Sequence, residues 1–159
     1  KWVLLALAWA VTASADCTSL SNDQTRTSAW YVANCLSPSR YDRNLWPTAD
    51  NGTYTKVEAQ LTLTQMDDVN ERFGQVTVGG YFRMQWRDPR IAYNSSSFPR
   101  GVNLKNYKPS DVIWIPDIYI DNLVKSHTSS DAVDMLTVSP DGLVYRSYEV
   151  LWTIKCTLA

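Results

Sequence analysis

Apolar and polar residues alternate along much of the chain, which is the pattern of β-strands with one buried face. In residues 57–64 every second side chain is apolar, and these are Val57, Ala59, Leu61 and Leu63. We therefore predict a half-buried antiparallel strand there. The same alternation predicts a second strand whose inward side chains are Val76, Val78, Phe82, Met84 and Trp86.

A β-hairpin and one helix complete the main elements. Residues 133–139 and 143–154 flank Pro140-Asp141-Gly142, a turn sequence that favours a hairpin. Residues 26–36 contain neither Gly nor Pro and space their apolar side chains by three and four, which predicts an amphipathic helix ended by Pro38. The expected fold class is all-β, an immunoglobulin-like β-sandwich with one amino-terminal α-helix.

The connections have distinct compositions. Residues 67–72 are mostly charged and predict an exposed turn. Residues 94–110 are rich in Ser, Asn, Pro and Gly, and they predict a long loop with one short strand. Within the apolar residues 113–120, Pro116 cannot donate to a sheet and marks an edge or a bend.

The first residues have the composition of a targeting segment. Lys1 is followed by the apolar residues 3–11 and by Ala-Ser-Ala at residues 13–15, which predicts a signal peptide at 1–15. The apolar run is too short to span a bilayer. The remaining residues 16–159 fit a single domain. Asn51 and Asn94 begin acceptor sequons and are expected glycosylation sites.

Charge and cysteines narrow the possible classes of protein. A formal net charge of -1 implies neither a nucleic acid nor an anionic membrane surface as partner. Of three cysteines, Cys17 and Cys35 could pair and close a short loop. Cys156 is then left over, either as a small buried side chain or with a partner that lies outside this chain.

Catalytic chemistry is not indicated. His127 is the one histidine, and the sequence suggests no positioned partner for it, so we expect a solvated loop residue. No spacing typical of metal ligands, no phosphate-binding glycine loop and no nucleophile motif is present. We therefore expect no enzyme, no metal and no cofactor.

A better candidate for a site is the pair Tyr81 and Arg83. Residues two apart on a strand project from the same face, about 7 Å from each other. An aromatic ring and a guanidinium would then stand side by side, and the guanidinium can form two hydrogen bonds with one carboxylate. The alternative is a solvated face on which Arg83 pairs with a neighbouring acid.

Two motifs occur together in the chain: Gln-Trp-x-Asp-Pro-Arg-x-Ala-Tyr at residues 85–93 and Trp-x-Pro-Asp at residues 114–117. They resemble the extracellular ligand-binding domain of Cys-loop receptors, the pentameric ligand-gated ion channels, and most closely the glycine and GABA receptor branch. Residues 68–71 resemble the family's Asp-Val-Asp-Glu turn, and Cys156 falls where the first cysteine of the signature loop belongs. The resemblance implies a domain truncated at its carboxyl end, with the partner of Cys156 missing.

The resemblance also implies a ligand site between adjacent subunits. The complementary face would carry the loop D residues Tyr81 and Arg83 and the loop E residues Thr137 and Ser139. The principal face would carry the loop A residues Tyr119 and Asp121. Coupling to the pore would involve the turn residues Asn70, Glu71 and Arg72.

The implied ligand is a small amine or amino acid, and the implied partners are homologous subunits in a homo- or hetero-pentamer. The resemblance places the full-length protein in the secretory pathway and at the extracellular face of the plasma membrane. A second hypothesis is a soluble secreted protein similar to the acetylcholine-binding proteins, and a third is an unrelated adhesion sandwich. Four downstream apolar runs of about 20 residues would distinguish a channel from a soluble protein.

Overall fold

The computed structural model describes residues 17–18, 20, 25–49, 52–127 and 134–156. The predicted signal peptide and Asn51 lie outside this part of the chain. The described strands form one six-stranded sheet with the order β1-β2-β6-β5-β3, and β4 pairs with β6. All five strand pairings are antiparallel. The all-β prediction with an amino-terminal helix is confirmed.

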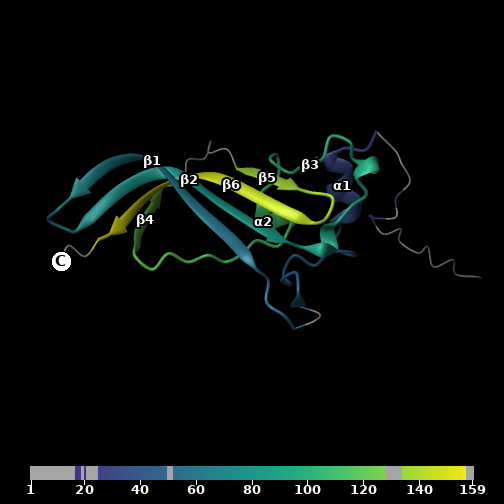
Figure 1. The fold of residues 1–159 in the computed structure, drawn as a ribbon, viewed down its shortest axis with the longest axis horizontal. Helices are drawn as coiled ribbons and strands as arrows, with labels where there is room; N and C mark the ends of the chain where they lie inside the picture. The colour runs from purple at the N-terminus through teal and green to yellow at the C-terminus, as the bar shows by residue number, and fades with distance from the viewer. Residues whose placement is uncertain (1–16, 19, 21–24, 50–51, 128–133, 157–159) are drawn as a thin grey trace, which may run out of the picture.

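Three long strands form the centre of the sheet (Figure 1). They are β1 (Val57–Asn70), β2 (Gln75–Arg87) and β6 (Leu143–Lys155). Three shorter strands flank them: β3 (Val102–Asn103), β4 (Leu123–His127) and β5 (Met135–Val138). The predicted hairpin is therefore confirmed as β5 and β6.

The helices are few and short. Helix α1 (Ser28–Cys35) begins one residue after Thr27, whose side chain accepts a hydrogen bond from the Trp30 N–H. This cap explains why the helix starts two residues later than predicted. The remaining helical segments are α2 (Pro109–Val112) and the 3-10 turns η2 (Pro89–Ile91) and η3 (Ser95–Ser97).

The core lies on one face of the sheet, mainly at the end nearest α1. The inward side chains predicted for β2 are confirmed, because Phe82, Met84 and Trp86 are at most 7% exposed. Tyr31 of α1 is fully buried and packs edge-on against Tyr93 and Phe98. Helix α1 and the irregular segments between η2 and β4 thus cover the apolar face of the sheet.

Three expectations about individual elements were wrong. The apolar side chains of β1 are not half-buried, since Leu63 is 56% exposed and no described element covers them. The turn predicted at residues 67–72 begins only at Glu71, because β1 continues to Asn70 in register with Gln75. His127 is exposed as expected, but it ends strand β4 instead of lying in a loop.

Candidate functional site

Tyr81 and Arg83 lie on the face of β2 that points away from the core. Tyr81 is 41% exposed and stands in register between Thr62 of β1 and Glu149 of β6. Since residues directly opposite each other in a sheet share a face, Tyr81 and Glu149 form neighbouring parts of one surface. We call the surface formed by Thr62, Tyr81, Arg83 and Glu149 the arginine face.

The guanidinium of Arg83 is held next to the Tyr81 ring. Its Nη1 donates a 2.5 Å hydrogen bond to Thr62 Oγ1, and its Cζ lies 5.6 Å from the ring centroid. Among the described residues no acidic side chain forms an ion pair with Arg83. A guanidinium has five N–H donors, and the bond to Thr62 uses one. The hypothesis that Arg83 serves only a structural ion pair is therefore not supported.

Thr137 lies on the same side of the sheet as the arginine face. It stands opposite Tyr145 of β6, which in turn stands opposite Gln85 of β2. Ser139 follows β5 in the hairpin turn, where its N–H donates to the Leu143 carbonyl at 2.8 Å. A shallow depression of about 220 Å³ lies between β1, β2 and β6 on this side, and Arg83 is part of its lining.

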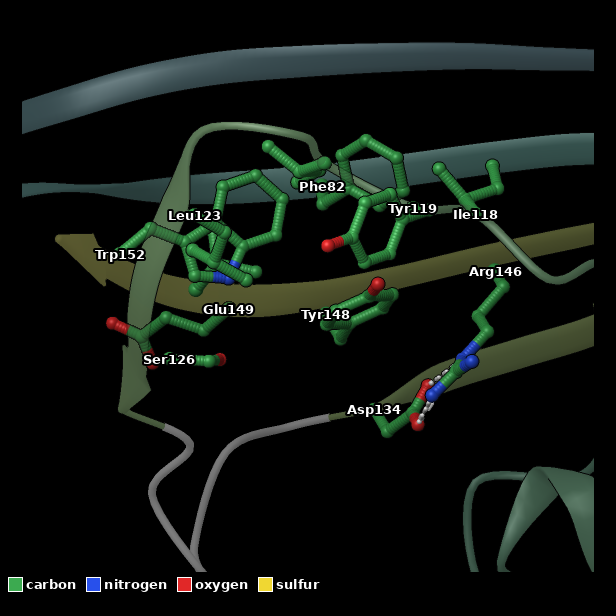
Figure 2. Close-up of a pocket in the computed structure, with 12 residues that line it drawn as sticks. Phe82, Ile118, Tyr119, Leu123, Ser126, Asp134, Arg146, Tyr148, Glu149 and Trp152 are labelled. Atoms are coloured by element: carbon green, nitrogen blue, oxygen red, sulfur yellow. Dashed lines mark hydrogen bonds and ion pairs between the residues drawn. The ribbon is translucent and has the colours of Figure 1, made fainter. Parts of the chain in front are cut away.

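Tyr119 and Asp121 belong to a different surface. Tyr119 is 84% exposed and borders a pocket of about 410 Å³ on the opposite, apolar side of the sheet (Figure 2). Asp121 is exposed and does not line this pocket. The structure thus brings together Tyr81, Arg83 and Thr137 on one side of the sheet and leaves Tyr119 and Asp121 apart from them.

The pocket beside Tyr119 contains polar groups that the sequence analysis did not select. Arg146 forms an ion pair with Asp134 at 2.6 Å, and its Cζ lies 4.4 Å from the Tyr148 ring centroid (Figure 2). Burial raises the pKa of Tyr148, the Arg146 charge opposes this, and Asp134 adds to it. Arg146 interrupts the apolar face of β6 between Val144 and Tyr148, and this break in the alternation was the available signal.

A buried polar cluster fixes the start of the segment that carries Tyr119. Asp88 is 1% exposed and accepts hydrogen bonds from the Tyr41 hydroxyl at 2.9 Å and from Arg90 Nη2 at 2.7 Å. The Tyr41 oxygen in turn accepts the Trp114 N–H at 2.9 Å. Burial, followed by the nearby Asp88 charge, raises the pKa of Tyr41 well above its usual range.

The other end of this segment is tied to β6. Asn122 Nδ2 donates to the Lys155 carbonyl at 3.1 Å, and the Lys155 N–H donates to the Asn122 carbonyl at 2.8 Å. Hydrogen bonds therefore hold the chain on both sides of Tyr119.

Asn70, Glu71 and Arg72 lie at the far end of the sheet from α1 (Figure 1). The Glu71 carbonyl accepts the Gly74 N–H at 3.2 Å, and the Gly74 carbonyl accepts the Cys156 N–H at 2.8 Å. The turn between β1 and β2 is thus connected directly to Cys156, which is a partly buried free thiol.

The remaining cysteine and sequon predictions have different outcomes. Cys17 and Cys35 form a disulfide with a Cα–Cα distance of 6.0 Å, so this pairing is confirmed. Asn94 is half-buried in the turn before η3. Across the described ranges there is no helix long and apolar enough to cross a membrane. In that same part of the chain no group of three or more potential metal ligands is found.

Comparisons with known proteins agree with the motifs. A profile of the neurotransmitter-gated ion-channel ligand binding domain matches residues 32–159. The neuronal acetylcholine receptor subunit beta-4 of Bos taurus is 33% identical over 117 residues, which cover 74% of this chain and 22% of the relative. The gamma-aminobutyric acid receptor subunit beta-4 of Gallus gallus is 31% identical over 120 residues, which cover 74% and 24%.

A third relative, the acetylcholine receptor subunit gamma of Gallus gallus, is 27% identical over 120 residues, which cover 76% of this chain and 23% of the relative. The chain belongs to the family of neurotransmitter-gated ion-channel ligand-binding domains, as the two motifs indicated. The relatives are receptor subunits and not enzymes. The chain spans 22% to 24% of the length of these three relatives.

Proposed function

We propose that this domain binds a small amine or amino acid at the boundary between adjacent subunits of a pentamer and thereby gates ion flow. The observation that carries the proposal is the guanidinium of Arg83, which stands beside Tyr81 on a solvent-facing surface without an acidic partner among the described residues. Tyr119 lies on the other side of the same sheet. In a ring of subunits, the arginine face of one copy would meet the Tyr119 segment of the next.

The side chains suit a ligand that carries both charges. Arg83 would bind a carboxylate through two parallel hydrogen bonds. Tyr81 and, from the neighbouring subunit, Tyr119 would attract an ammonium through their ring faces. Glu149, directly opposite Tyr81, adds a negative charge on the same surface. Thr137 and Ser139 would supply hydroxyl groups at its edge, and Asp121 would lie on the neighbouring subunit's side.

Transmission would start at the opposite end of the sheet. Asn70, Glu71 and Arg72 form an accessible turn that is hydrogen-bonded through Gly74 to Cys156. A ligand shifts a channel toward its open state only by binding that state more tightly. In this proposal the turn between β1 and β2 and the chain around Cys156 move together with that shift. The receptor would stand at the extracellular face of the plasma membrane after removal of residues 1–15.

The test uses the receptor subunit that carries this chain, expressed in oocytes and exposed to amines and amino acids. A hydrogen bond to a charged group contributes about 1.5–3 kcal/mol, so Arg83→Ala should raise the half-maximal agonist concentration about 10- to 100-fold. Arg87→Ala is the matched control, because Arg87 lies two residues further along the same face and pairs with Asp141 at 2.6 Å. Equal agonist sensitivity of Arg83→Ala and the wild type would refute the proposed role of the arginine face.

A further inference from the structure

The disulfide of Cys17 fastens the amino-terminal part of the described chain across the turn that contains Asn94. We call Cys17 and Leu20 the amino-terminal strap. Cys17 and Cys35 are 7% and 6% exposed, and Cys35 is the last residue of α1. Because α1 packs into the core through Tyr31, the disulfide anchors the strap to a fixed element.

The strap holds Asn94 through both its backbone and its side chain. The Asn94 N–H donates to the Cys17 carbonyl at 3.1 Å, and Asn94 Nδ2 donates to the Leu20 carbonyl at 3.2 Å. Ser97 Oγ lies 3.5 Å from the same Leu20 carbonyl. Asn94 therefore contributes to the surface on which the strap rests.

The other atom of the Asn94 amide is engaged as well. Its Oδ1 accepts the Ser96 N–H at 2.9 Å, which caps η3. The sequon Asn94-Ser95-Ser96 is thus folded into a tight turn, and its acceptor nitrogen lies under a backbone carbonyl. An N-linked glycan is bulky and needs a surface position at Nδ2.

We propose that Asn94 is a conditional glycosylation site, modified only on chains whose amino-terminal strap is open. In the transfer reaction one N–H bond of Nδ2 is replaced by a bond to the anomeric carbon of the sugar. The lipid diphosphate of the oligosaccharide donor is the leaving group, and the nitrogen loses a proton. The closed strap blocks this nitrogen with the Leu20 carbonyl, and the Cys17–Cys35 disulfide keeps the strap closed. Glycan and closed strap therefore exclude each other.

The experiment expresses the full 159-residue chain, behind a start codon, in cultured animal cells. Whole-cell lysate is digested without reduction, and glycan removal in heavy-oxygen water marks each formerly glycosylated asparagine for mass spectrometry. Wild-type peptides that contain the Cys17–Cys35 disulfide should carry unmodified Asn94. The double variant Cys17→Ser/Cys35→Ser should show at least several-fold higher occupancy at Asn94, and adding Ser96→Ala should abolish it.

A second variant separates opening of the strap from general unfolding. Asp88→Ala removes a buried carboxylate of the core while leaving both cysteines and the sequon intact. Its occupancy at Asn94 should stay at the wild-type value. A digest in which the intact disulfide and a glycan at Asn94 occur on the same molecules would overturn the proposal. Equal occupancy in the wild type and the cysteine variant, or an increase in Asp88→Ala as large as in the cysteine variant, would also overturn it.

Discussion

At the residue scale, Asp88 connects the sheet to the segment that carries a candidate site residue. Its carboxylate accepts hydrogen bonds from Arg90 and from Tyr41, and Tyr41 in turn holds the backbone of Trp114. Arg90 also lies over the Tyr41 ring, with its Cζ 4.7 Å from the centroid. The placement of Tyr119 therefore depends on a charge that is 1% exposed.

Asp88→Ala should lower the free energy of unfolding by about 3–5 kcal/mol, because it leaves the partly buried Arg90 guanidinium without its counter-charge. Urea unfolding followed by tryptophan fluorescence measures the change. Arg87→Ala removes an exposed ion pair and should cost less than about 1 kcal/mol. Similar losses in the two variants would contradict the structural role of Asp88.

The buried tyrosines predict a loss of stability in alkali. Burial, followed by the neighbouring Tyr93, raises the pKa of Tyr31 far above the ordinary tyrosine value. Tyr31 keeps its proton in the folded chain, whereas an unfolded chain loses it near pH 10, so the unfolded state is favoured progressively above about pH 10. Tyr31→Phe should reduce this slope by up to about 1.4 kcal/mol per pH unit.

Urea midpoints measured from pH 8 to pH 11 test this expectation. Tyr54 is 87% exposed, and Tyr54→Phe should leave the slope unchanged. A Tyr31→Phe chain with the wild-type slope would show that Tyr31 does not contribute. A uniform decrease at all pH values is expected in addition, because the Tyr31 hydroxyl donates to the Ile91 carbonyl.

Some residue-level features of the site followed from the sequence and others did not. The period of two along β2 correctly predicted that Tyr81 and Arg83 share an outward face. The partner of Arg83 was not predictable, because Thr62 is 21 residues away and its position depends on the register of β1 against β2. For the same reason, the position of Glu149 opposite Tyr81 became visible only in the structure.

At the element scale, the turn between β5 and β6 depends on Gly142. This residue has φ of +79°, and a Cβ added to it would lie 2.3 Å from the Asp88 carbonyl oxygen. Gly101 has φ of +69° with no atom within 4 Å of such a Cβ, so it isolates the cost of the backbone conformation. Gly101→Ala should cost about 1–2 kcal/mol.

Gly142→Ala should cost clearly more than Gly101→Ala, because the clash adds to the strain of the left-handed conformation. Thermal unfolding followed by circular dichroism compares the two variants. Equal melting temperatures would mean that the turn moves away from Asp88 without cost.

Strand β1 predicts self-association of the chain. It is an edge strand, and Leu61, Leu63, Met66 and Val69 are between 43% and 66% exposed. An exposed apolar edge strand favours pairing with another chain. Leu63→Glu should therefore raise the concentration at which the chain associates about tenfold, as measured by sedimentation velocity. Gln60→Glu, with the same change in charge on another position of β1, should leave that concentration unchanged, and equal effects of both would refute the expectation.

Strands with clear alternation and specific turn residues were the elements that the sequence predicted well. β2, β6 and the hairpin turn at Gly142 belong to this group. Strand β4 was missed because Leu-Val-Lys-Ser-His has no alternation, and a register shift between Leu123 and Lys125 disturbs its pairing with β6. The exposure of β1 was missed because alternation reports which side chains share a face, not whether another element covers it.

At the scale of the whole molecule, one sheet separates the two sets of candidate ligand contacts. Arg83, Tyr81 and Thr137 lie on one side, and Tyr119 borders a pocket on the other. Within one copy these groups cannot contact the same small ligand. The arrangement fits a site that is completed by a neighbouring copy, in the manner of an interface between subunits arranged in a ring.

The most direct test of this account is an electron cryomicroscopy structure of the assembled receptor that carries this chain, with an activating ligand bound. The account predicts ligand density within hydrogen-bonding distance of Arg83 in one subunit and against Tyr119 of the adjacent subunit. Ligand density at another position, with the arginine face of each subunit open to solvent, would contradict it.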